Sequence, residues 1–590
     1  MSVPRGERRL VLVLFLVTLL VRLAGVAVML KLDARPSFDE YGYDRRAQGW
    51  QAVADDLARG DVAPEHWEQA YADGFQPPLH PLLMSTVYTA DGAGAARARA
   101  LSALWSALAT PLVYLIARRL ADRRAALAAA GLHVLYPAFT FFGASLWAEP
   151  LYILLLLGAW ERALAAREVA ASQAGGRAQL RRAATAGLAL GLLMLTRPAG
   201  LPFLLLLPLA FLGPRRCWAG RRRAAGVMVL AAVLTILPWE ATLWRQEGRP
   251  VLLATGTGFN LALGNNPLIG RGEGATWLGP ATHARLQREV AAFAAARGLA
   301  PDAAMQAYAL DQVARDPAAA LRRVVERAAL LWSADAFPVR HLVHAVVRPL
   351  PMPLVAAVWA LTFAAYLSLV GLALRGLLIP GRLRHRRALL LLTLAGAIGP
   401  LLTIAFSRLH LPLLALLLPA AGVGWTYRAE LRSRARRLAL AGSLAVVAVV
   451  AAGTLKPVIE TQLMPSAWAR PVVAPVARAV GARPVFGDLV ELFYKPAAAA
   501  HPDSLRITPA PGETTTIPLD RPARLTLTIH PGAPWHRGTL TLRAIPGDME
   551  VVVDPVAPNL WWTDQDLTPL GFPGLQMRWQ GGAAAYDYVN

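Results

Sequence analysis

Long apolar segments alternate with short arginine-rich connections over most of this chain of 590 residues. Six connections hold 27 of the 60 Lys and Arg residues and five of the 38 acids, and so carry the whole net charge of +22. They are residues 5–9, 118–124, 161–182, 214–223, 375–387 and 428–437. Basic residues gathered between apolar segments indicate the cytoplasmic side of a membrane protein. This distribution disfavours a nucleic-acid-binding surface, because the charge is divided among separate connections.

If all six connections face the cytoplasm, each stretch between two of them crosses the membrane an even number of times. That condition, with a mean hydropathy of +0.40, predicts a polytopic all-α membrane protein with eleven transmembrane helices. The spans are expected near residues 10–30, 97–117, 125–143, 148–163, 183–196, 200–213, 224–243, 352–375, 388–406, 409–426 and 438–455. The N-terminus is then cytoplasmic and the C-terminus extracytoplasmic.

The same topology divides the chain into a transmembrane module, residues 1–455, and an extracytoplasmic tail, residues 456–590. Residues 31–96 and 244–351 are exported loops of the module. The first contains an amphipathic pattern from Trp50 to Leu57 that is typical of a helix lying in the membrane interface. In the second, Asp316 followed by Pro317 predicts the start of a helix. The tail has short stretches of alternating polarity, which predict a small β-sandwich.

Ionisable residues at the predicted outer ends of spans are few and of both signs. Asp39 and Glu40 follow the first span, and Glu149 lies in a short outer turn. Asp39 and Glu40 are either solvated residues of an acidic loop or part of a functional site. Glu149 is either a carboxylate that stabilises the start of a helix or part of that site. For Asp39 and Glu40 we favour a site, because their loop is held at the membrane surface between an apolar span and an interfacial helix. For Glu149 both interpretations stay open.

Arg197 and Arg408 are the matching cations at outer ends of spans. They either extend toward lipid headgroups or bind a phosphate at the membrane surface, since a guanidinium contacts phosphate oxygens in bidentate fashion. Arg22, inside the first span, is expected to face another helix. No His/Cys cluster, phosphate-binding glycine loop or serine nucleophile motif occurs, so no cofactor is predicted; a divalent ion at the acidic loop stays open.

The chain resembles the GT-C membrane glycosyltransferases of the protein O-mannosyltransferase and lipid A aminoarabinose transferase type. The likeness runs in order through about residues 8–430, and departs from the family pattern at Thr242, Leu243 and Glu149. The matching motifs are Asp39-Glu40-x-x-Tyr43-x-x-x-Ala47, Pro77 to Leu82, Ala98-Arg99, Ala117 to Leu120, Thr196-Arg197-Pro198, Pro238-Trp239, Gly264 to Pro267 and Arg408-x-x-x-Pro412.

The resemblance implies transfer of a sugar from a polyprenyl-phosphate donor to an extracytoplasmic protein, lipid or glycan acceptor in a bacterial inner membrane. It implies a catalytic role for Asp39 and Glu40, with Asp39 as the general base of an inverting displacement. Arg197 and Arg408 then bind the donor phosphate. Glu149, Tyr43 and His80 are expected to orient the substrates.

Two other functions fit a polytopic protein with exported loops. A transporter or lipid flippase would use intramembrane arginines along a conduit. Such proteins often contain two related halves, which this sequence lacks, and its acids gather outside the membrane. A non-catalytic assembly protein would need its tail but not Asp39 and Glu40. Neither the sugar nor the acceptor is identified by these patterns.

Overall fold

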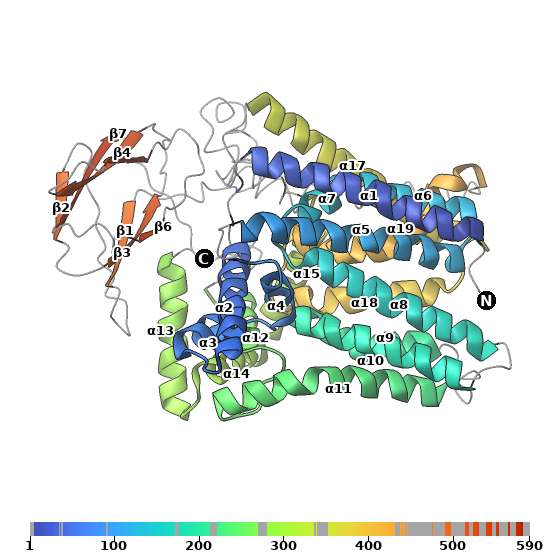
Figure 1. Cartoon of the computed structure of the whole chain (residues 1–590), viewed down its shortest axis with the longest axis horizontal. Helices are drawn as coiled ribbons and strands as arrows, with labels where there is room; N and C mark the ends of the chain where they lie inside the picture. Colours follow the sequence, from blue (N-terminus) through green and yellow to red (C-terminus); the bar gives the residue numbers. More distant parts are fainter. Residues whose placement is uncertain are drawn as a thin grey trace. The chain divides into compact units, whose positions relative to one another are not determined.

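The computed structural model of the chain describes residues 5–32, 39–89, 93–171, 176–212, 221–268, 280–335 and 352–430, strands between residues 490 and 581, and a few single positions between these ranges (Figure 1). Two compact units are distinguished. The first comprises residues 1–276, 288–338 and 357–450, and the second comprises residues 277–287, 339–356 and 451–590. The candidate site lies within the first unit.

Helices occupy the positions of ten of the eleven predicted spans. They are α1 (Arg5–Lys31), α5 (Gly94–Leu120), α6 (Arg123–Leu135) with α7 (Pro137–Gly143), α8 (Glu149–Ala171), α9 (Gly176–Thr196), α10 (Leu201–Leu212), α11 (Arg222–Glu247), α17 (Met352–Leu378), α18 (Arg386–Leu402) and α19 (Leu411–Thr426). The predicted span at 438–455 lies largely outside the described residues.

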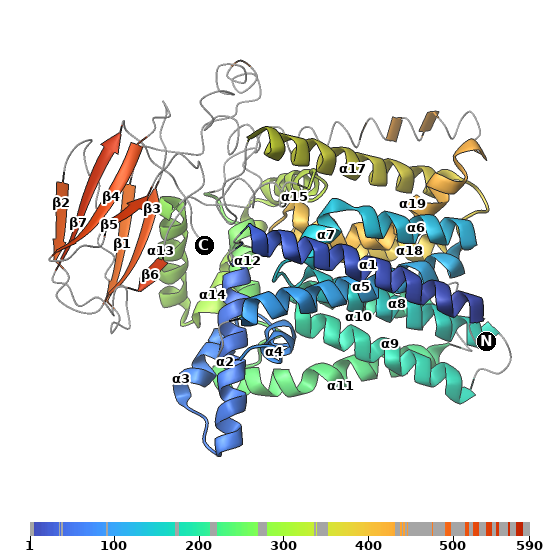
Figure 2. The same cartoon turned by 45° about the horizontal axis from the view of Figure 1, so that its top comes forward.

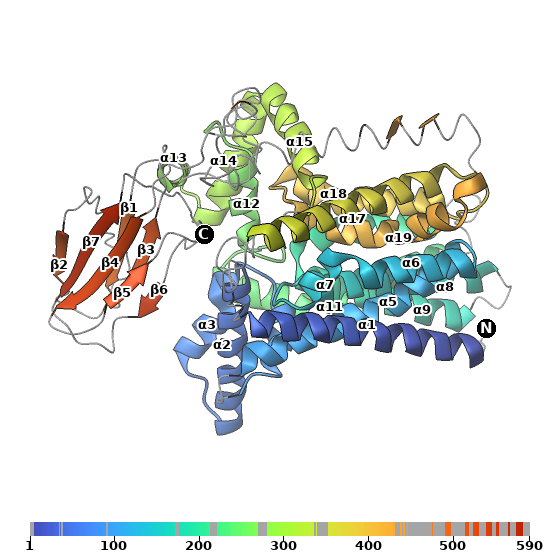
Figure 3. The same ribbon diagram turned by 90° about the horizontal axis from the view of Figure 1, so that it is seen from above.

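Five of the described helices are each long and apolar enough to cross a membrane, and six if the bent pair α6–α7 counts as one span. The protein is therefore a multi-pass membrane protein, while the number eleven stays a prediction. The long helices α1, α5, α8, α9 and α11 lie side by side in all three views (Figures 1, 2 and 3).

The arginine-rich connections come together at one end of this bundle. Ion pairs join the first connection to the second, the second to the third, and the fifth to the sixth. These pairs are Arg118–Glu7 at 3.3 Å, Arg119–Glu161 at 2.9 Å and Arg382–Glu430 at 2.6 Å. The backbone N–H of Arg384 also donates to the Leu120 carbonyl at 2.7 Å. This clustering is what a common cytoplasmic face requires, and the orientation itself stays a prediction.

Arg22 fastens α1 to the bend between α6 and α7, where the two helix axes differ by 57°. Pro137 has no N–H to donate to the carbonyl of His133 four residues before it. Arg22 replaces that donor, with Nη2 2.7 Å from the His133 oxygen and Nη1 2.9 Å from the Val134 oxygen. The guanidinium is fully buried. The prediction that Arg22 faces another helix is thus confirmed.

The described parts of the two loops that are predicted to be exported are mainly helical. In the first loop, α2 (Asp39–Arg59), α3 (Pro64–Tyr71) and α4 (Leu79–Ser85) lie at the ends of the long helices (Figures 1, 2 and 3). In the second, the described helices are α12 (Gly256–Gly264), α13 (Pro280–Arg297), α14 (Pro301–Arg315) and α15 (Pro317–Leu331). The Asp316 carboxylate accepts from the Ala319 N–H at 2.9 Å, which confirms the predicted helix start.

The described residues of the tail form seven strands in two antiparallel sheets. One sheet has the order β1–β3–β6 and the other β2–β7–β4–β5. The strands are β1 (Val490–Pro496), β2 (Thr514–Pro518), β3 (Ala523–Ile529), β4 (Gly538–Ile545), β5 (Glu550–Val553), β6 (Asp564–Asp566) and β7 (Gly574–Gly581). Whether the sheets pack as a sandwich, and whether the domain boundary lies at residue 455, stay predictions.

Candidate active site

Asp39 and Arg408, which lie 369 positions apart in the sequence, form a direct ion pair. Asp39 is the first residue of α2, and Arg408 lies in the single 3₁₀ turn η4 (Ser407–His410) that leads into α19. Nη2 of Arg408 is 2.7 Å from Oδ2 of Asp39. The Asp39 side chain is 38% exposed, whereas that of Arg408 is 9% exposed. The carboxylate therefore stays accessible at the edge of a buried cation.

An aromatic ring supports the Arg408 guanidinium from a second direction. Its central carbon lies 4.1 Å from the centroid of the Trp147 ring, within the distance of a cation–π contact. Trp147 is buried in the turn that precedes α8. The sequence analysis did not select Trp147, although its place two residues before Glu149 was a usable signal.

Arg197 and Glu149 form the second ion pair. Glu149 begins α8, and Arg197 lies between the end of α9 and Pro198. Nη1 of Arg197 donates to Oε1 of Glu149, whose side chain is 1% exposed. Burial alone would lower the pKa of the Arg197 guanidinium, but the carboxylates of Glu149 and Asp39 raise it. Arg197 is therefore close enough to Asp39 for the two charges to interact.

Both guanidiniums line one recess. Its space is about 340 Å³ when the opening to the outside is included. Its other walls come from Tyr152 and from small or apolar residues of η2 (Pro198–Gly200), η4, α18 and α19. These residues are Ala199, Gly396, Pro400, Leu409 and Pro412. We call this space the Arg197/Arg408 recess. Two cations above apolar walls suit an anionic group attached to an apolar chain.

Tyr43 and His80 form a buried layer near the two ion pairs. Their ring centroids are 4.6 Å apart in an edge-on arrangement. Burial raises the pKa of the Tyr43 hydroxyl to about 12. The two arginines of the ion pairs lower this pKa by smaller amounts, and the two carboxylates raise it. Burial and the charges of Arg197 and Arg46 lower the pKa of His80 to about 3. Within the described residues, neither His80 nitrogen has a hydrogen-bond partner.

Glu40 points into the protein rather than toward the Arg197/Arg408 recess. Its Oε1 accepts from the backbone N–H of Leu146 at 2.7 Å and lies 3.9 Å from Nη1 of Arg99. Both side chains are 1% exposed. Arg99 also donates to the carbonyls of Ala144 and Ala34. These contacts fasten the start of α2 to the turn before α8 and so hold Asp39 beside Trp147 and Glu149.

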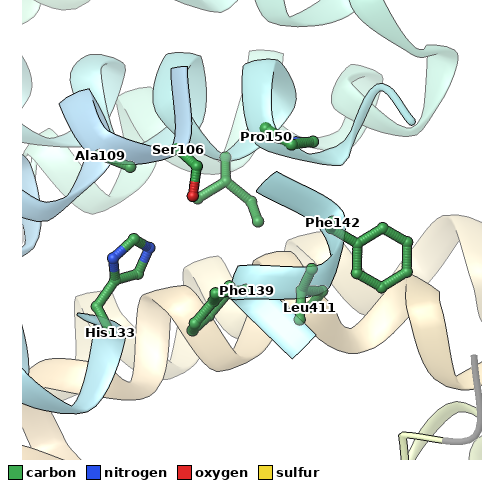
Figure 4. A pocket seen from close by; sticks show the side chains of 8 residues that line it. Ser106, Ala109, His133, Phe139, Phe142, Pro150 and Leu411 are labelled. Carbon is green, nitrogen blue, oxygen red and sulfur yellow. The ribbon is translucent and has the colours of Figure 1, made fainter. Parts of the chain in front are cut away.

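A second, smaller cavity lies inside the bundle and has a different character. It encloses about 210 Å³ and is lined mainly by apolar side chains of α5, α7, α8 and α19 (Figure 4). The polar groups at its wall are engaged. Ser106 accepts from Nε of Arg22 at 3.0 Å, and Nδ1 of His133 is 2.7 Å from the Thr110 hydroxyl. This cavity is a packing space rather than a reaction site.

Part of the chain matches a protein-family model. Residues 75–239 match the family described as dolichyl-phosphate-mannose-protein mannosyltransferase. The chain resembles the GT-C membrane glycosyltransferases. The matched segment contains His80, Glu149 and Arg197, and it stops before Arg408. A comparison with curated proteins gives no match.

Solved structures show weak similarities to the chain. The archaeal oligosaccharyltransferase AglB from Archaeoglobus fulgidus, in complex with an inhibitory peptide and a dolichol-phosphate, is 15% identical, with 76% of this chain and 56% of AglB covered and a TM-score of 0.38. ArnT from Cupriavidus metallidurans bound to undecaprenyl phosphate is 16% identical, with 72% and 79% covered and a TM-score of 0.33. Arabinosyltransferase EmbB from Mycobacterium smegmatis is 14% identical, with 100% and 65% covered and a TM-score of 0.30. At these scores the similarities carry no part of the argument below.

Proposed function

We propose that this protein transfers a sugar from a polyprenyl-phosphate donor to an acceptor on the extracytoplasmic side of the membrane. One observation carries the proposal: two carboxylates and two guanidiniums from distant parts of the sequence meet at one recess. Asp39 pairs with Arg408, Glu149 pairs with Arg197, and both arginines line the recess. The match of residues 75–239 to a mannosyltransferase family supports the same reaction class.

The recess suits a lipid-linked phosphate. The phosphate would contact Arg408 and Arg197, and the first isoprene units would lie against the apolar wall below them. Arg408 is paired with Asp39 in the ligand-free protein, so an arriving phosphate competes with Asp39 for the guanidinium. Trp147 keeps Arg408 in place during that exchange. Charge that develops on the departing phosphate is then stabilised by the two cations without a cofactor.

In this proposal Asp39 acts as the general base. The acceptor oxygen attacks the anomeric carbon while its proton passes to the Asp39 carboxylate. The bond between the anomeric carbon and the phosphate oxygen breaks, and polyprenyl phosphate leaves with that electron pair. A single displacement of this kind inverts the anomeric configuration. Glu40 would support Asp39 by fixing the start of α2, while Glu149, Tyr43 and His80 shape the substrate pocket.

The test is a transfer assay with Asp39→Asn, which keeps the size of the side chain and removes its basicity. The full-length protein in lipid nanodiscs receives radiolabelled polyprenyl-phosphate sugars and a cell-envelope extract as acceptor. We expect transfer by the parent protein and a loss of roughly 10²–10⁴-fold in the variant. Asparagine keeps an oxygen that can accept from Arg408, but Arg408 is only 9% exposed and loses its charged partner, so the variant should also lose about 1–3 kcal/mol of stability. Thermal unfolding of the same samples separates this loss from the loss of transfer.

Asp55→Asn is the matched control. Asp55 lies on the same helix, is exposed, and accepts a hydrogen bond from Gln51 at 2.9 Å. This variant should transfer sugar as the parent does. Equal transfer by the Asp39→Asn variant would remove Asp39 from the mechanism. A parent that transfers no sugar from any polyprenyl-phosphate donor would contradict the proposed function and favour a transporter or flippase.

A further inference from the structure

The turn that carries Arg408 is anchored by His410, two residues later. The His410 side chain is fully buried, whereas Arg408 reaches the Arg197/Arg408 recess. Nδ1 of His410 is 2.7 Å from the Leu331 carbonyl oxygen, and Nε2 is 2.7 Å from Oδ1 of Asp335. Both partners belong to the second exported loop, at the end of α15 and just after it. One imidazole therefore joins the start of α19 to that loop.

The chemistry of these partners makes the anchor stiff. A carbonyl oxygen only accepts, so Nδ1 of His410 donates its hydrogen to Leu331. The contact to Asp335 then holds one proton between Nε2 and Oδ1, whichever atom carries it. This 2.7 Å bond between two buried side chains fixes the imidazole in one orientation, and it is charge-assisted when the proton is on Nε2. Tyr366 stacks on the imidazole with ring centroids 5.0 Å apart and limits its rotation.

Asp335 extends the anchor to a third segment. Its Oδ2 accepts from the hydroxyl of Tyr136, which lies at the bend between α6 and α7. Both side chains are buried. Segments around residues 136, 335 and 410 are thus joined at one carboxylate. Arg408 lies in the turn η4, so this junction helps to hold its guanidinium beside Asp39, together with the contact to Trp147.

We propose that His410, Asp335 and Tyr136 are positioning residues that hold Arg408 for the donor phosphate. The inference rests on the proposed function, because it assigns Arg408 to that phosphate. None of the three touches the Arg197/Arg408 recess, so they act through Arg408. Misplacement of a contact by about 1 Å is enough to reduce a rate by roughly 10²-fold.

The two amide replacements of His410 separate its two bonds. The amide nitrogen of asparagine lies where Nδ1 was, and that of glutamine lies where Nε2 was. His410→Asn should therefore keep the bond to Leu331 and lose the one to Asp335, and His410→Gln should do the reverse. We expect sugar transfer to fall on the order of 10²-fold in His410→Asn and far less in His410→Gln. Asp335→Leu, which keeps a side chain of similar size and removes both hydrogen-bonding oxygens, should lower transfer as His410→Asn does.

A second measurement is the affinity of the protein in nanodiscs for undecaprenyl phosphate. If His410 served only the stability of the fold, its replacement would not change this affinity. His410→Asn and Arg408→Gln should each weaken binding. The double variant should bind as weakly as Arg408→Gln alone, since the anchor acts only through Arg408. Tyr366→Phe is the control for stability: it removes the 2.6 Å bond to the Trp332 carbonyl and leaves the anchor intact. It should lower the unfolding temperature without weakening binding.

Three results would overturn the inference in a protein whose parent form is active. They are parental transfer by the His410→Asn and Asp335→Leu variants, equal losses in His410→Asn and His410→Gln, and losses of binding that add fully in the double variant. If His410→Asn fails to fold, Asp335→Leu and His410→Gln give the same comparison. A parent protein that neither transfers sugar nor binds undecaprenyl phosphate would instead contradict the proposed function, and this inference with it.

Discussion

The ion pair between Glu149 and Arg197 is expected to respond unequally to the loss of either partner. The Glu149 side chain is 1% exposed, and Oε2 has no hydrogen-bond partner within the described residues. The Arg197 side chain is 19% exposed, at the wall of the recess. Arg197→Gln therefore leaves an uncompensated buried carboxylate, whereas Glu149→Gln leaves a cation that water reaches in part.

These differences set the expected magnitudes. Removing one partner of a buried pair costs about 3–5 kcal/mol, and we expect Arg197→Gln to fall in that range. The position of Glu149 at the N-terminus of α8 offsets about 0.3–1 kcal/mol of it. Glu149→Gln should cost about 1–3 kcal/mol, the range for a partly solvated group that loses a hydrogen bond. The double variant buries no charge from this pair and should recover most of the parental stability.

Reversible unfolding in mixed detergent micelles measures these free energies, and sugar transfer is measured on the same samples. The double variant should be stable but inactive, because the donor phosphate has lost one of its two cations. The reasoning is refuted if Glu149→Gln is the more destabilising single change. It is also refuted if the double variant is no more stable than Arg197→Gln.

Three further predictions concern stability. The folded pKa of His80 is about 3 against an unfolded value of about 6.5, so the free energy of unfolding falls as the pH drops below 6.5. At pH 5 this loss of stability is about 2 kcal/mol. The His80→Phe variant should lack this part of the pH dependence when unfolding is measured from pH 4.5 to 7.5. Asp316→Ala removes the N-cap of α15 and should cost about 1 kcal/mol in unfolding free energy, whereas Asp316→Asn should cost less. Gly376→Ala places a methyl group 1.8 Å from the Ala420 carbonyl oxygen between α17 and α19, and should cost about 1–3 kcal/mol by thermal or denaturant unfolding. The first prediction is contradicted if His80→Phe unfolds with the parental pH dependence. The second is contradicted if Asp316→Ala has the parental unfolding free energy, and the third if Gly376→Ala has the parental unfolding temperature.

Most helix positions follow from the sequence because two strong signals agree along the first 430 residues. Apolar length places each helix, and the arginine-rich connections fix where pairs of helices must turn back. The bend at Pro137 was not predicted, because residues 125–143 are continuous in hydropathy. Proline removes the hydrogen bond that would have kept α6 and α7 on one axis.

The candidate site was partly predictable for a different reason. Charged residues at the ends of apolar segments are costly in lipid, so Asp39, Arg197 and Arg408 stood out. Which carboxylate pairs with which guanidinium depends on tertiary packing, and no spacing rule shows that Asp39 meets Arg408. Trp147 and Asp335 were missed because each resembles an ordinary loop residue until its partner is known.

The contact between Arg22 and the α6–α7 bend makes the residues at positions 22 and 137 depend on each other. An alanine at position 137 would return an N–H to the His133 carbonyl, which then competes with Nη2 of Arg22 and leaves the buried guanidinium with one partner fewer. A leucine at position 22 would remove the donor to the His133 and Val134 carbonyls at the bend. Each change alone is a defect, whereas the two together restore a continuous helix beside a neutral neighbour. Among relatives of this protein, arginine and proline should therefore be inherited or exchanged as a pair.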